Sequence, residues 1–383
     1  MRVGLVTGEY PPMQGGVGDF TQQLGRALAT AGTEVHVITS RQAGTESTER
    51  VTVHTVPGGW TFGSLARVRT IARRQRLDLL NIQYQAAAYG LSAPIHFLPD
   101  VAGVKTVVTF HDLRIPYLFP KAGRLRAAAV THLARAAGGV IVTDAAEELE
   151  LRRRGGVARL VQIPIGSNVQ PAPPAGYDRE AWRASLPVGP GELLLGYFGF
   201  LNESKGGDTL ISALAILKDR RAPFKLVLIG GQTGASDETN AAFEAKLERM
   251  IRRYDLADHI VRTGFVPAAQ VSAHLLACDA IVLPYRDGVS FRRGSLMAAL
   301  AHGCAIITTE PKTPMPDVRD GVNLRLVPPN SAQALVLAIS GLLDAPALRA
   351  RLGQGARELA QAFSWDTIAR RTLDFYQSVA GAA

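Results

Sequence analysis

A histidine follows an apolar, strand-like run in the first half of the chain. Residues 107–110 read Val-Val-Thr-Phe, and His111 and Asp112 come directly after them. Side chains at the carboxyl ends of strands line the ligand sites of open α/β sheets. A neutral imidazole there can hydrogen-bond a substrate hydroxyl, and a neighbouring carboxylate can fix its tautomer. We therefore take His111 as a candidate site residue; the alternative is a structural histidine beside the sheet.

A lysine and two arginines follow strand-like runs in the second half. A strand expected at 193–198 leads through Gly199 to Lys205 at the start of a helix, where the helix dipole and an ammonium group together favour a phosphate. A later loop, 284–293, ends in Arg292 and Arg293, whose guanidinium groups suit bidentate contact with phosphate. This loop and the turn before a helix expected at 297–302 also offer hydroxyl and backbone N–H groups, at Ser290, Gly294, Ser295 and Leu296. Two cationic loops on one sheet predict a diphosphate site; the alternative for the arginines is a solvated pair.

A glycine-rich segment follows the first strand. Gly15, Gly16 and Gly18 precede a helix, and their missing side chains would let a ligand approach the backbone. The distance from the strand end departs from the dinucleotide-binding fingerprint. A flexible strand-to-helix loop is the alternative.

Two α/β sheets must position these residues. Short β-rich runs alternate with longer segments of helical period, which is typical of parallel strands joined by helices. In the first half we expect strands at 3–7, 34–39, 52–56, 79–83, 106–110, 139–143 and 160–163. In the second half we expect strands at 193–198, 225–229, 260–263, 280–283, 305–308 and 324–327. The fold class is therefore α/β, with two Rossmann-like sheets.

Two further segments organise the chain. The Pro-rich stretch 170–176 suits an exposed connection between domains, because proline fixes φ and removes a backbone donor. The last helical segment, 365–379, carries apolar residues that need a surface on which to be buried.

Composition excludes several classes of protein. The chain has 383 residues, of which 47% are hydrophobic and 20% charged, so we expect two globular domains and no disordered or coiled-coil chain. No apolar run reaches the roughly 18 residues of a membrane-spanning helix, and the N-terminus lacks a signal pattern. Cys278 and Cys304 lie in apolar surroundings without metal-type spacing, so we expect buried, reduced thiols. We expect a cytoplasmic protein.

Positive charge is concentrated in the first half of the chain. Residues 1–189 contain 21 Lys and Arg against 14 Asp and Glu, whereas the remaining residues contain 21 against 19. Such an excess can attract an anionic membrane surface, an acidic substrate or nucleic acid, although solvated arginine-rich helix faces are the alternative. No aromatic residues interleave with the arginines as base-stacking platforms, so nucleic acid is not expected.

The motifs together resemble the family 4 glycosyltransferases of the GT-B fold, which are retaining enzymes that use nucleotide-sugar donors. The resemblance spans nearly the whole chain. It rests on Pro11-Pro12 with Gly15-Gly16-Val17-Gly18, Thr109-Phe110-His111-Asp112, Gly199 with Lys205-Gly206, Thr263-Gly264-Phe265-Val266-Pro267, residues 296–303 and Phe363-Ser364-Trp365.

The resemblance implies a division into domains and a role for each motif. It implies an N-terminal Rossmann-like acceptor domain (1–169), a linker (170–189), a C-terminal Rossmann-like donor domain (190–362) and a C-terminal helix (363–383) that packs back on the first domain. Lys205 matches the family lysine on the donor diphosphate, Gly16 the loop that closes near it, and His111 the histidine that contacts the transferred sugar. Phe265 and Val266 match the region beside the nucleotide base.

Two departures from the family pattern concern the donor site. The family usually has an arginine where Phe200 stands, and two glutamates where Ser290 and Ala298 stand. We infer that Arg292 or Arg293 supplies the missing cation and that Ser290 or Asp287 takes over part of the hydroxyl recognition.

The expected function is transfer of a sugar from a nucleoside diphosphate sugar to an acceptor hydroxyl with retention of configuration, in assembly of a cell-surface polysaccharide or glycolipid. His111, Lys205, Arg292 and Arg293 are the expected catalytic residues. We expect no cofactor besides the nucleotide-sugar substrate and no metal ion, since no Asp-x-Asp pair is present. The basic first half suits a lipid-linked or acidic acceptor and peripheral contact with an anionic inner membrane face.

Three alternatives remain for comparison. A non-catalytic glycosyltransferase-like partner or nucleotide-sugar-binding protein is favoured by the missing glutamates. An epimerase of the same fold would need a carboxylate and histidine set that is not found in the right places. An oxidoreductase would need the dinucleotide fingerprint that the first turn lacks.

Overall fold

The computed structural model describes residues 1–13, 15–40, 50–113, 123–199, 202–230 and 238–381. The chain forms two compact units. Unit 1 comprises Met1–Gly166 together with Ser364–Ala383, and unit 2 comprises Ser167–Phe363. The two units are described in turn.

Unit 1 is built on a parallel sheet whose strands run in the order β3-β2-β1-β4-β5-β6-β7. All seven predicted strands are present, each within one residue of its expected bounds. They are β1 (Arg2–Thr7), β2 (Glu34–Ser40), β3 (Val51–Val56), β4 (Leu79–Tyr84), β5 (Lys105–Phe110), β6 (Gly139–Val142) and β7 (Leu160–Gln162). Because helices cover both faces, β1 is mostly apolar and buried, and β4 is buried along its whole length although it contains Asn81 and Gln83.

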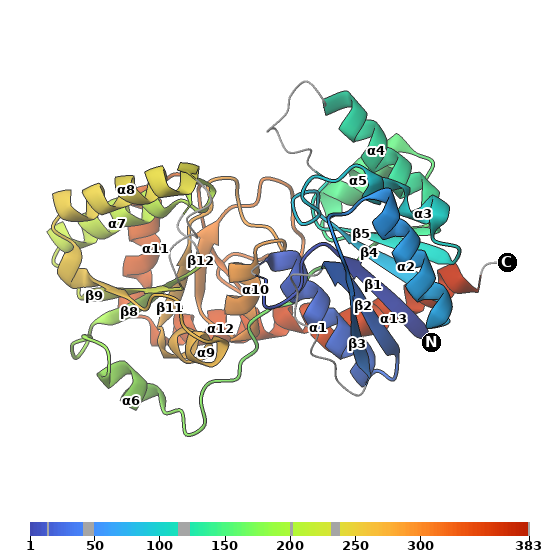
Figure 1. The fold of residues 1–383 in the computed structure, drawn as a ribbon. Helices are drawn as coiled ribbons and strands as arrows, with labels where there is room; N and C mark the ends of the chain where they lie inside the picture. Colours follow the sequence, from blue (N-terminus) through green and yellow to red (C-terminus); the bar gives the residue numbers. More distant parts are fainter. Residues whose placement is uncertain (14, 41–49, 114–122, 200–201, 231–237, 382–383) are drawn as a thin grey trace. The chain divides into compact units, whose positions relative to one another are not determined.

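Helices cover both faces of this sheet (Figure 1). One face packs on α1 (Gly16–Thr30) and α13 (Trp365–Ala380) in a core that includes Leu24, Leu28 and Ile368. The other face carries α2 (Phe62–Arg74), η1 (Pro94–Phe97), α3 (Leu98–Val101), α4 (Gly123–Ala136) and α5 (Ala145–Arg154).

The last helix, α13, belongs to unit 1 although unit 2 precedes it in the chain. Ser364 caps its N-terminus by accepting a hydrogen bond from the amide of Thr367. Its buried face includes Ile368, Tyr376 and Val379. A Cβ atom on Gly139 of β6 would lie 2.8 Å from the Phe375 ring, so this glycine allows α13 to approach the sheet closely.

Unit 2 is built on a second parallel sheet, in the order β10-β9-β8-β11-β12-β13. Its strands also match the predicted positions within one residue: β8 (Leu193–Phe198), β9 (Phe224–Ile229), β10 (Ile260–Arg262), β11 (Ala280–Leu283), β12 (Ile306–Thr309) and β13 (Arg325–Val327). The α/β architecture with two parallel sheets is thus confirmed.

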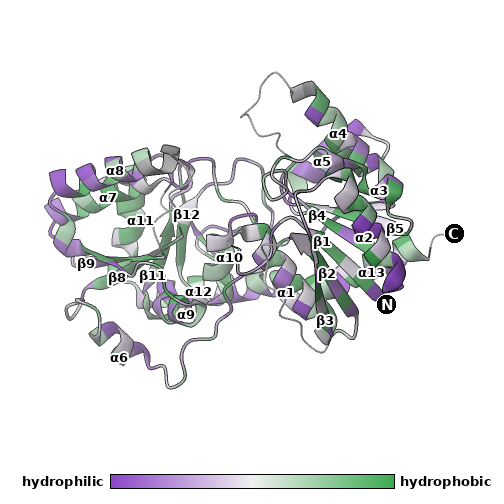
Figure 2. Cartoon of the chain, viewed as in Figure 1, coloured by the Kyte–Doolittle hydropathy of each residue, from purple (hydrophilic) through white to green (hydrophobic). Residues whose placement is uncertain are grey.

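Both faces of the second sheet are also covered. The main core lies between the sheet and the helices α7 (Gly207–Asp219), α8 (Glu238–Arg253) and α11 (Ala332–Leu343), with α12 (Pro346–Ala360) at its border. The apolar strands lie inside these layers, and polar residues lie on the outer turns of α8 (Figure 2). The opposite face packs on α9 (Ala268–Ala277) and α10 (Gly294–Ala301). Short 3-10 turns complete the unit: η3 (Glu203–Lys205), η4 (Ala257–His259) and η5 (Gln361–Phe363).

The segment 170–189, predicted as a linker, contains a helix, α6 (Arg179–Ala184), and groups with unit 2. Asp178 caps this helix, and Arg183 forms an ion pair with Asp279 at 3.0 Å. The indole of Trp182 donates a hydrogen bond to His274 of α9. These contacts fold the second half of a segment whose prolines indicated an extended connection.

Among the described residues, none of the helices combines the length and the apolar character that crossing a membrane would require.

Candidate functional site

The loop after β8 places Lys205 at the carboxyl edge of the second sheet. Asn202 caps the turn η3 by accepting a hydrogen bond from the Lys205 amide at 3.1 Å. Gly206 has φ +69°, and a Cβ atom there would lie 1.9 Å from the carbonyl oxygen of Pro284, so only glycine fits. A Cβ atom on Gly199 would lie 2.9 Å from Lys205 Nζ. The lysine side chain therefore lies over the strand end, where the sequence predicted it.

Lys205 is half-buried, and its environment destabilises the charged form. Burial, and secondarily the positive charge of Arg293, lowers the pKa of Lys205 to about 8. Unlike-charge pairing would have the opposite effect, so this ammonium group is placed in a locally positive, desolvated position. Binding of an anion would stabilise the charged form of Lys205.

The loop before α10 brings Arg293 to the same place. The guanidinium group of Arg293 forms an ion pair with Asp287 and lies 4.8 Å from the centre of the Tyr285 ring. The Tyr285 hydroxyl hydrogen-bonds the Ser295 hydroxyl at 2.8 Å, and both side chains are buried. Tyr285 thus holds both the arginine and the first turn of α10.

The helix α10 begins three residues earlier than predicted, at Gly294. Gly294, Ser295 and Leu296 therefore form its first turn, and Arg293 stands at the N-cap, where its side chain does not cap the helix. This first turn presents backbone N–H groups near Gly199, since Ser295 Cβ is 3.8 Å from a Cβ position on Gly199. The Ser290 carbonyl accepts a hydrogen bond from the Arg293 amide. Arg292 is half-buried in the same loop.

The residues predicted beside a nucleotide base lie along the same edge. The Thr263 hydroxyl accepts a hydrogen bond from the Gly230 amide at 3.1 Å, which joins the ends of β9 and β10. A Cβ atom on Gly230 would lie 3.9 Å from the backbone nitrogen of Gly199. Phe265 is 82% exposed and Val266 is half-buried, so an aromatic face is open to solvent beside the strand ends.

His111 lies at the carboxyl end of β5 in unit 1, as predicted. Its Nε2 is 2.9 Å from Oε1 of Gln83 on β4, and its ring meets the edge of Phe20 from α1 at 4.7 Å between centroids. Phe20 also packs on Trp365 of α13. Burial lowers the pKa of the His111 imidazole to about 3, so the ring is neutral at physiological pH.

The glycines at the N-terminus of α1 differ in role: Gly15 is the N-cap, and Gly16 and Gly18 lie in the first turn. A Cβ atom on Gly15 would fall within 2.3 Å of the Glu9 carboxylate, whose Oε1 accepts hydrogen bonds from the amides of Val17 and Gly18 at 3.0 and 3.2 Å. These amides therefore face a protein carboxylate rather than open solvent, and Gly15 makes room for that carboxylate. Gly16, which was expected in a loop before the helix, is instead the first residue of α1; it is exposed, and no atom lies within 4 Å of its Cβ position.

The structure therefore brings Gly199, Lys205, Arg293, Gly294, Ser295 and Leu296 together on unit 2, with Phe265 and Val266 along the same edge. Sequence reasoning missed the partners that hold this set. Tyr285 lay in the expected loop 284–293 and Gln83 in the expected strand 79–83, and neither these two residues nor Glu9 was singled out. The alternation of Asn81 and Gln83 in an otherwise apolar strand was the available signal for Gln83. Phe200 lies outside the described residues.

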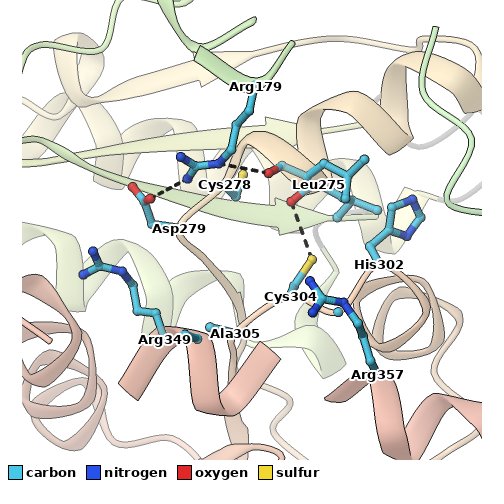
Figure 3. Close-up of a pocket in the computed structure, with 12 residues that line it drawn as sticks. Arg179, Leu275, Cys278, Asp279, His302, Cys304, Ala305, Arg349 and Arg357 are labelled. Atoms are coloured by element: carbon cyan, nitrogen blue, oxygen red, sulfur yellow. Dashed lines mark hydrogen bonds and ion pairs between the residues drawn. The ribbon is translucent and has the colours of Figure 1, made fainter. Parts of the chain in front are cut away.

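A pocket of about 270 Å³ lies at the other edge of the unit 2 sheet, before β11 and β12 (Figure 3). Arg179 donates to the Leu276 carbonyl at the end of α9 and pairs with Asp279 at 2.7 Å. Arg349 donates to the Leu343 carbonyl at the end of α11. The arginines thus satisfy helix C-termini, which is a structural role.

Both cysteines line this pocket as free thiols; Cys304 is buried, as predicted, whereas Cys278 is partly exposed. The Cys304 side chain is buried and donates to the Leu275 carbonyl at 3.5 Å. Burial raises the pKa of Cys304 to about 12, and burial also raises that of Cys278. The thiols are therefore protonated and unreactive at neutral pH.

Comparisons with known proteins cover nearly the whole chain. A family model described as Glycosyl transferases group 1 matches residues 178–359, and a model described as Glycosyl transferase 4-like domain matches residues 15–166. D-inositol 3-phosphate glycosyltransferase of Pseudarthrobacter chlorophenolicus is 26% identical over 417 residues, covering 98% of this chain and 95% of the relative. Phosphatidyl-myo-inositol mannosyltransferase of Mycolicibacterium smegmatis is 27% identical over 403 residues, covering 100% and 95%.

A solved structure shares the fold. Anabaena Alr3699/HepE in complex with UDP and glucose superposes with a TM-score of 0.76 at 21% identity, covering 99% of this chain and 100% of that one. At this identity the likeness establishes the fold alone.

Proposed function

Because the chain belongs to the family 4 glycosyltransferases of the GT-B fold, we propose that it transfers a hexosyl group from a nucleoside diphosphate sugar to an acceptor hydroxyl with retention of anomeric configuration. The product belongs to a cell-surface polysaccharide or glycolipid. The observation that carries the proposal is the cationic cradle of Lys205, Arg293 and the first turn of α10 at one edge of the unit 2 sheet.

The cradle suits the leaving group of this reaction. As the bond between the sugar and the diphosphate breaks, negative charge builds on the diphosphate and positive charge on the sugar ring. Fixed cations and N–H dipoles at the diphosphate stabilise that transition state without reorganisation. We assign Lys205, Arg293, Arg292 and the amides of Gly294 and Ser295 to this role, in place of a metal ion.

The acceptor proton goes to the departing phosphate in this proposal. The acceptor oxygen forms the new bond to the anomeric carbon on the face from which the diphosphate leaves, and the leaving phosphate oxygen takes the hydroxyl proton. No protein base is then needed. His111 contacts the transferred sugar as a neutral hydrogen-bonding group, which its low pKa supports.

The nucleotide base lies against the strand ends that carry Thr263 and Phe265. The exposed aromatic face of Phe265 supports stacking of a base there. The fold relative in complex with UDP and glucose makes uridine the first base to test. We propose that Ser290 takes part of the hydroxyl recognition, because Asp287 is already paired with Arg293.

The acceptor is lipid-linked or acidic, and unit 1 contacts an anionic membrane surface in this proposal. Phe62 and Phe97 are 63% and 38% exposed, with ring centroids 6.1 Å apart. Arg67 and Arg69 are exposed on the same helix as Phe62. Exposed aromatic rings beside arginines favour the interface of an anionic bilayer.

A second candidate is a nucleotide-sugar-binding partner without activity. Ala298, at the place of one family glutamate, is 1% exposed inside α10, so its methyl group offers no hydrogen bond to a donor. This observation favours a weakened or lost reaction.

The test combines binding with turnover. We expect one nucleoside diphosphate, UDP first, to raise the Tm of the wild-type protein, and the matching nucleotide sugar to be hydrolysed or transferred. Binding without any turnover would select the second candidate. No Tm shift with UDP, GDP, ADP or their sugars would contradict both.

A further inference from the structure

The imidazole of His111 is held in one specific orientation by the strand beside it. Gln83 lies on β4, and the register pairs Gln83 with Thr7 on one side and with Thr109 on the other. The Gln83 side chain is fully buried, at 0% exposure. Its Oε1 lies 2.9 Å from His111 Nε2, while Phe20 packs edge to face against the ring. Two neighbouring elements therefore restrict the ring.

The chemistry of this contact selects a tautomer. A neutral imidazole carries one proton, and an amide oxygen can only accept. With Oε1 facing the ring at 2.9 Å, the contact is a hydrogen bond only when the proton is on Nε2, which leaves the lone pair on Nδ1.

Gln83 carries a cost that an apolar residue would avoid. Among the described residues, its Nε2 atom has no hydrogen-bond partner although it is buried. A buried donor without a partner destabilises the folded state. Leucine or methionine would fill the same space between α1, α13 and the sheet without this cost, so the amide serves through its oxygen.

We infer that Gln83 is a positioning residue that fixes His111 in the Nε2-protonated tautomer, so that Nδ1 accepts a hydrogen bond from a hydroxyl of the bound sugar. The inference rests on the proposed function for the role of His111. It adds a residue that the motifs of the chain did not indicate.

The charged groups around the His111 ring do not set its protonation state. Burial is the cause of its low pKa. Asp112 follows it in the chain and Asp19 lies in the first turn of α1. Glu9 lies in the segment after β1, and its carboxylate accepts hydrogen bonds from the amides of Val17 and Gly18. A carboxylate introduced at Gln83 would therefore add a negative charge beside this imidazole and raise its pKa.

Two substitutions test the inference. Gln83→Met keeps the length and removes the acceptor; we expect kcat to fall about tenfold, because one hydrogen bond that positions the ring is lost, with the donor KM unchanged. Gln83→Glu keeps the shape and an acceptor but favours the imidazolium. We expect its kcat to approach the wild-type value at high pH and to fall at low pH with an ionisation that the wild-type profile lacks.

A spectroscopic readout is independent of turnover. In protein labelled with ¹⁵N-histidine, with His111 assigned through His111→Ala, we expect Nε2–H signals in wild type and a mixture of tautomers in Gln83→Met. Asn81→Leu is the matched control, since Asn81 lies two residues earlier on the same buried face and bonds Thr109 and Tyr376 instead. Its His111 signals should be those of wild type.

The outcomes distinguish failure of the inference about Gln83 from failure of the proposed role of His111. An unchanged Nε2–H tautomer in Gln83→Met, with unchanged kcat, would overturn the inference. Wild-type transfer by His111→Ala would remove the catalytic role of His111 from the proposed function, whereas the tautomer spectra would still decide the role of Gln83.

Discussion

The ring of Phe291 packs against the ring of Phe363, with centroids 4.5 Å apart and planes inclined at 45°. Phe291 lies in the loop that carries Arg293, and Phe363 is the last residue of unit 2 before the chain passes into unit 1. One aromatic contact thus joins the proposed donor loop to the point where the chain leaves the unit.

Phe291→Ala should weaken donor binding. An aromatic pair contributes about 0.5–1.5 kcal/mol beyond its buried area, so the loop loses preorganisation and we expect Kd for the bound nucleoside diphosphate to rise about two- to tenfold. Titration calorimetry measures this change. Phe291→Leu, which keeps the apolar contact, should have a smaller effect; equal Kd values for the alanine variant and wild type would show that the contact does not order the loop.

Lys205→Met should separate folding from binding. The fall in pKa from 10.5 to about 8 means that burying this charge costs up to about 3 kcal/mol. Removal of the charge should therefore leave Tm unchanged or raised, while the Tm increase caused by the nucleoside diphosphate disappears. Lys218→Met, a lysine that bonds carbonyl oxygens of the loop after α8, should retain that increase.

The pH dependence should show opposite trends for binding and stability. Donor affinity should fall as pH rises through about 8, because Lys205 loses its proton there. Between pH 8 and 10.5 the unfolded chain binds the proton that the folded chain has released, so this lysine's penalty on stability disappears over that range. Calorimetry and thermal melts at each pH would measure both, and parallel trends would be inconsistent with a buried Lys205.

The fold could be predicted because its strands are buried on both faces. Parallel strands such as β1 and β8 are nearly continuous apolar runs, and the glycines and histidines that follow them mark strand ends. The helix α6 was missed because its stability comes from Asp279 and α9, which are about a hundred residues away in sequence.

The candidate site could be predicted only in part, for the same reason. The positions of Lys205 and His111 follow from local pattern. The contacts of Arg293 with Asp287 and Tyr285 depend on the conformation of their loop. The contact of His111 with Gln83 depends on strand register. The local sequence pattern encodes neither.

The hydrogen bond between Asn81 and Tyr376 should couple strand and helix in unit 1. Both side chains are fully buried, and the Asn81 amide donates to the Tyr376 hydroxyl. Tyr376→Phe should lower the free energy of unfolding by about 1–3 kcal/mol, because it leaves a buried amide unpaired. Adding Asn81→Leu should cost less than the sum of the two single changes in a denaturant double-mutant cycle; strict additivity would mean that the two side chains are independent.

Vesicles test the membrane contact. We expect the wild-type protein to bind vesicles that contain anionic lipid and to be released from them at high salt. The double variant Arg67→Gln/Arg69→Gln and the single variant Phe62→Ser should lose this binding. Phe265→Ser is the matched control, because Phe265 is also strongly exposed but lies in unit 2. Equal binding to neutral vesicles at any salt would contradict an electrostatic contact.

The placement of α13 imposes an order on how the chain acquires its structure during synthesis. The sheet of unit 1 is complete when residue 162 has been made, yet the helix that covers one of its faces is made about two hundred residues later. At about 5–20 residues per second, a ribosome needs roughly 10–40 s to supply it. During that interval the apolar side chains that α13 covers in the finished fold lack that cover, and exposed apolar surface of this kind is prone to aggregation.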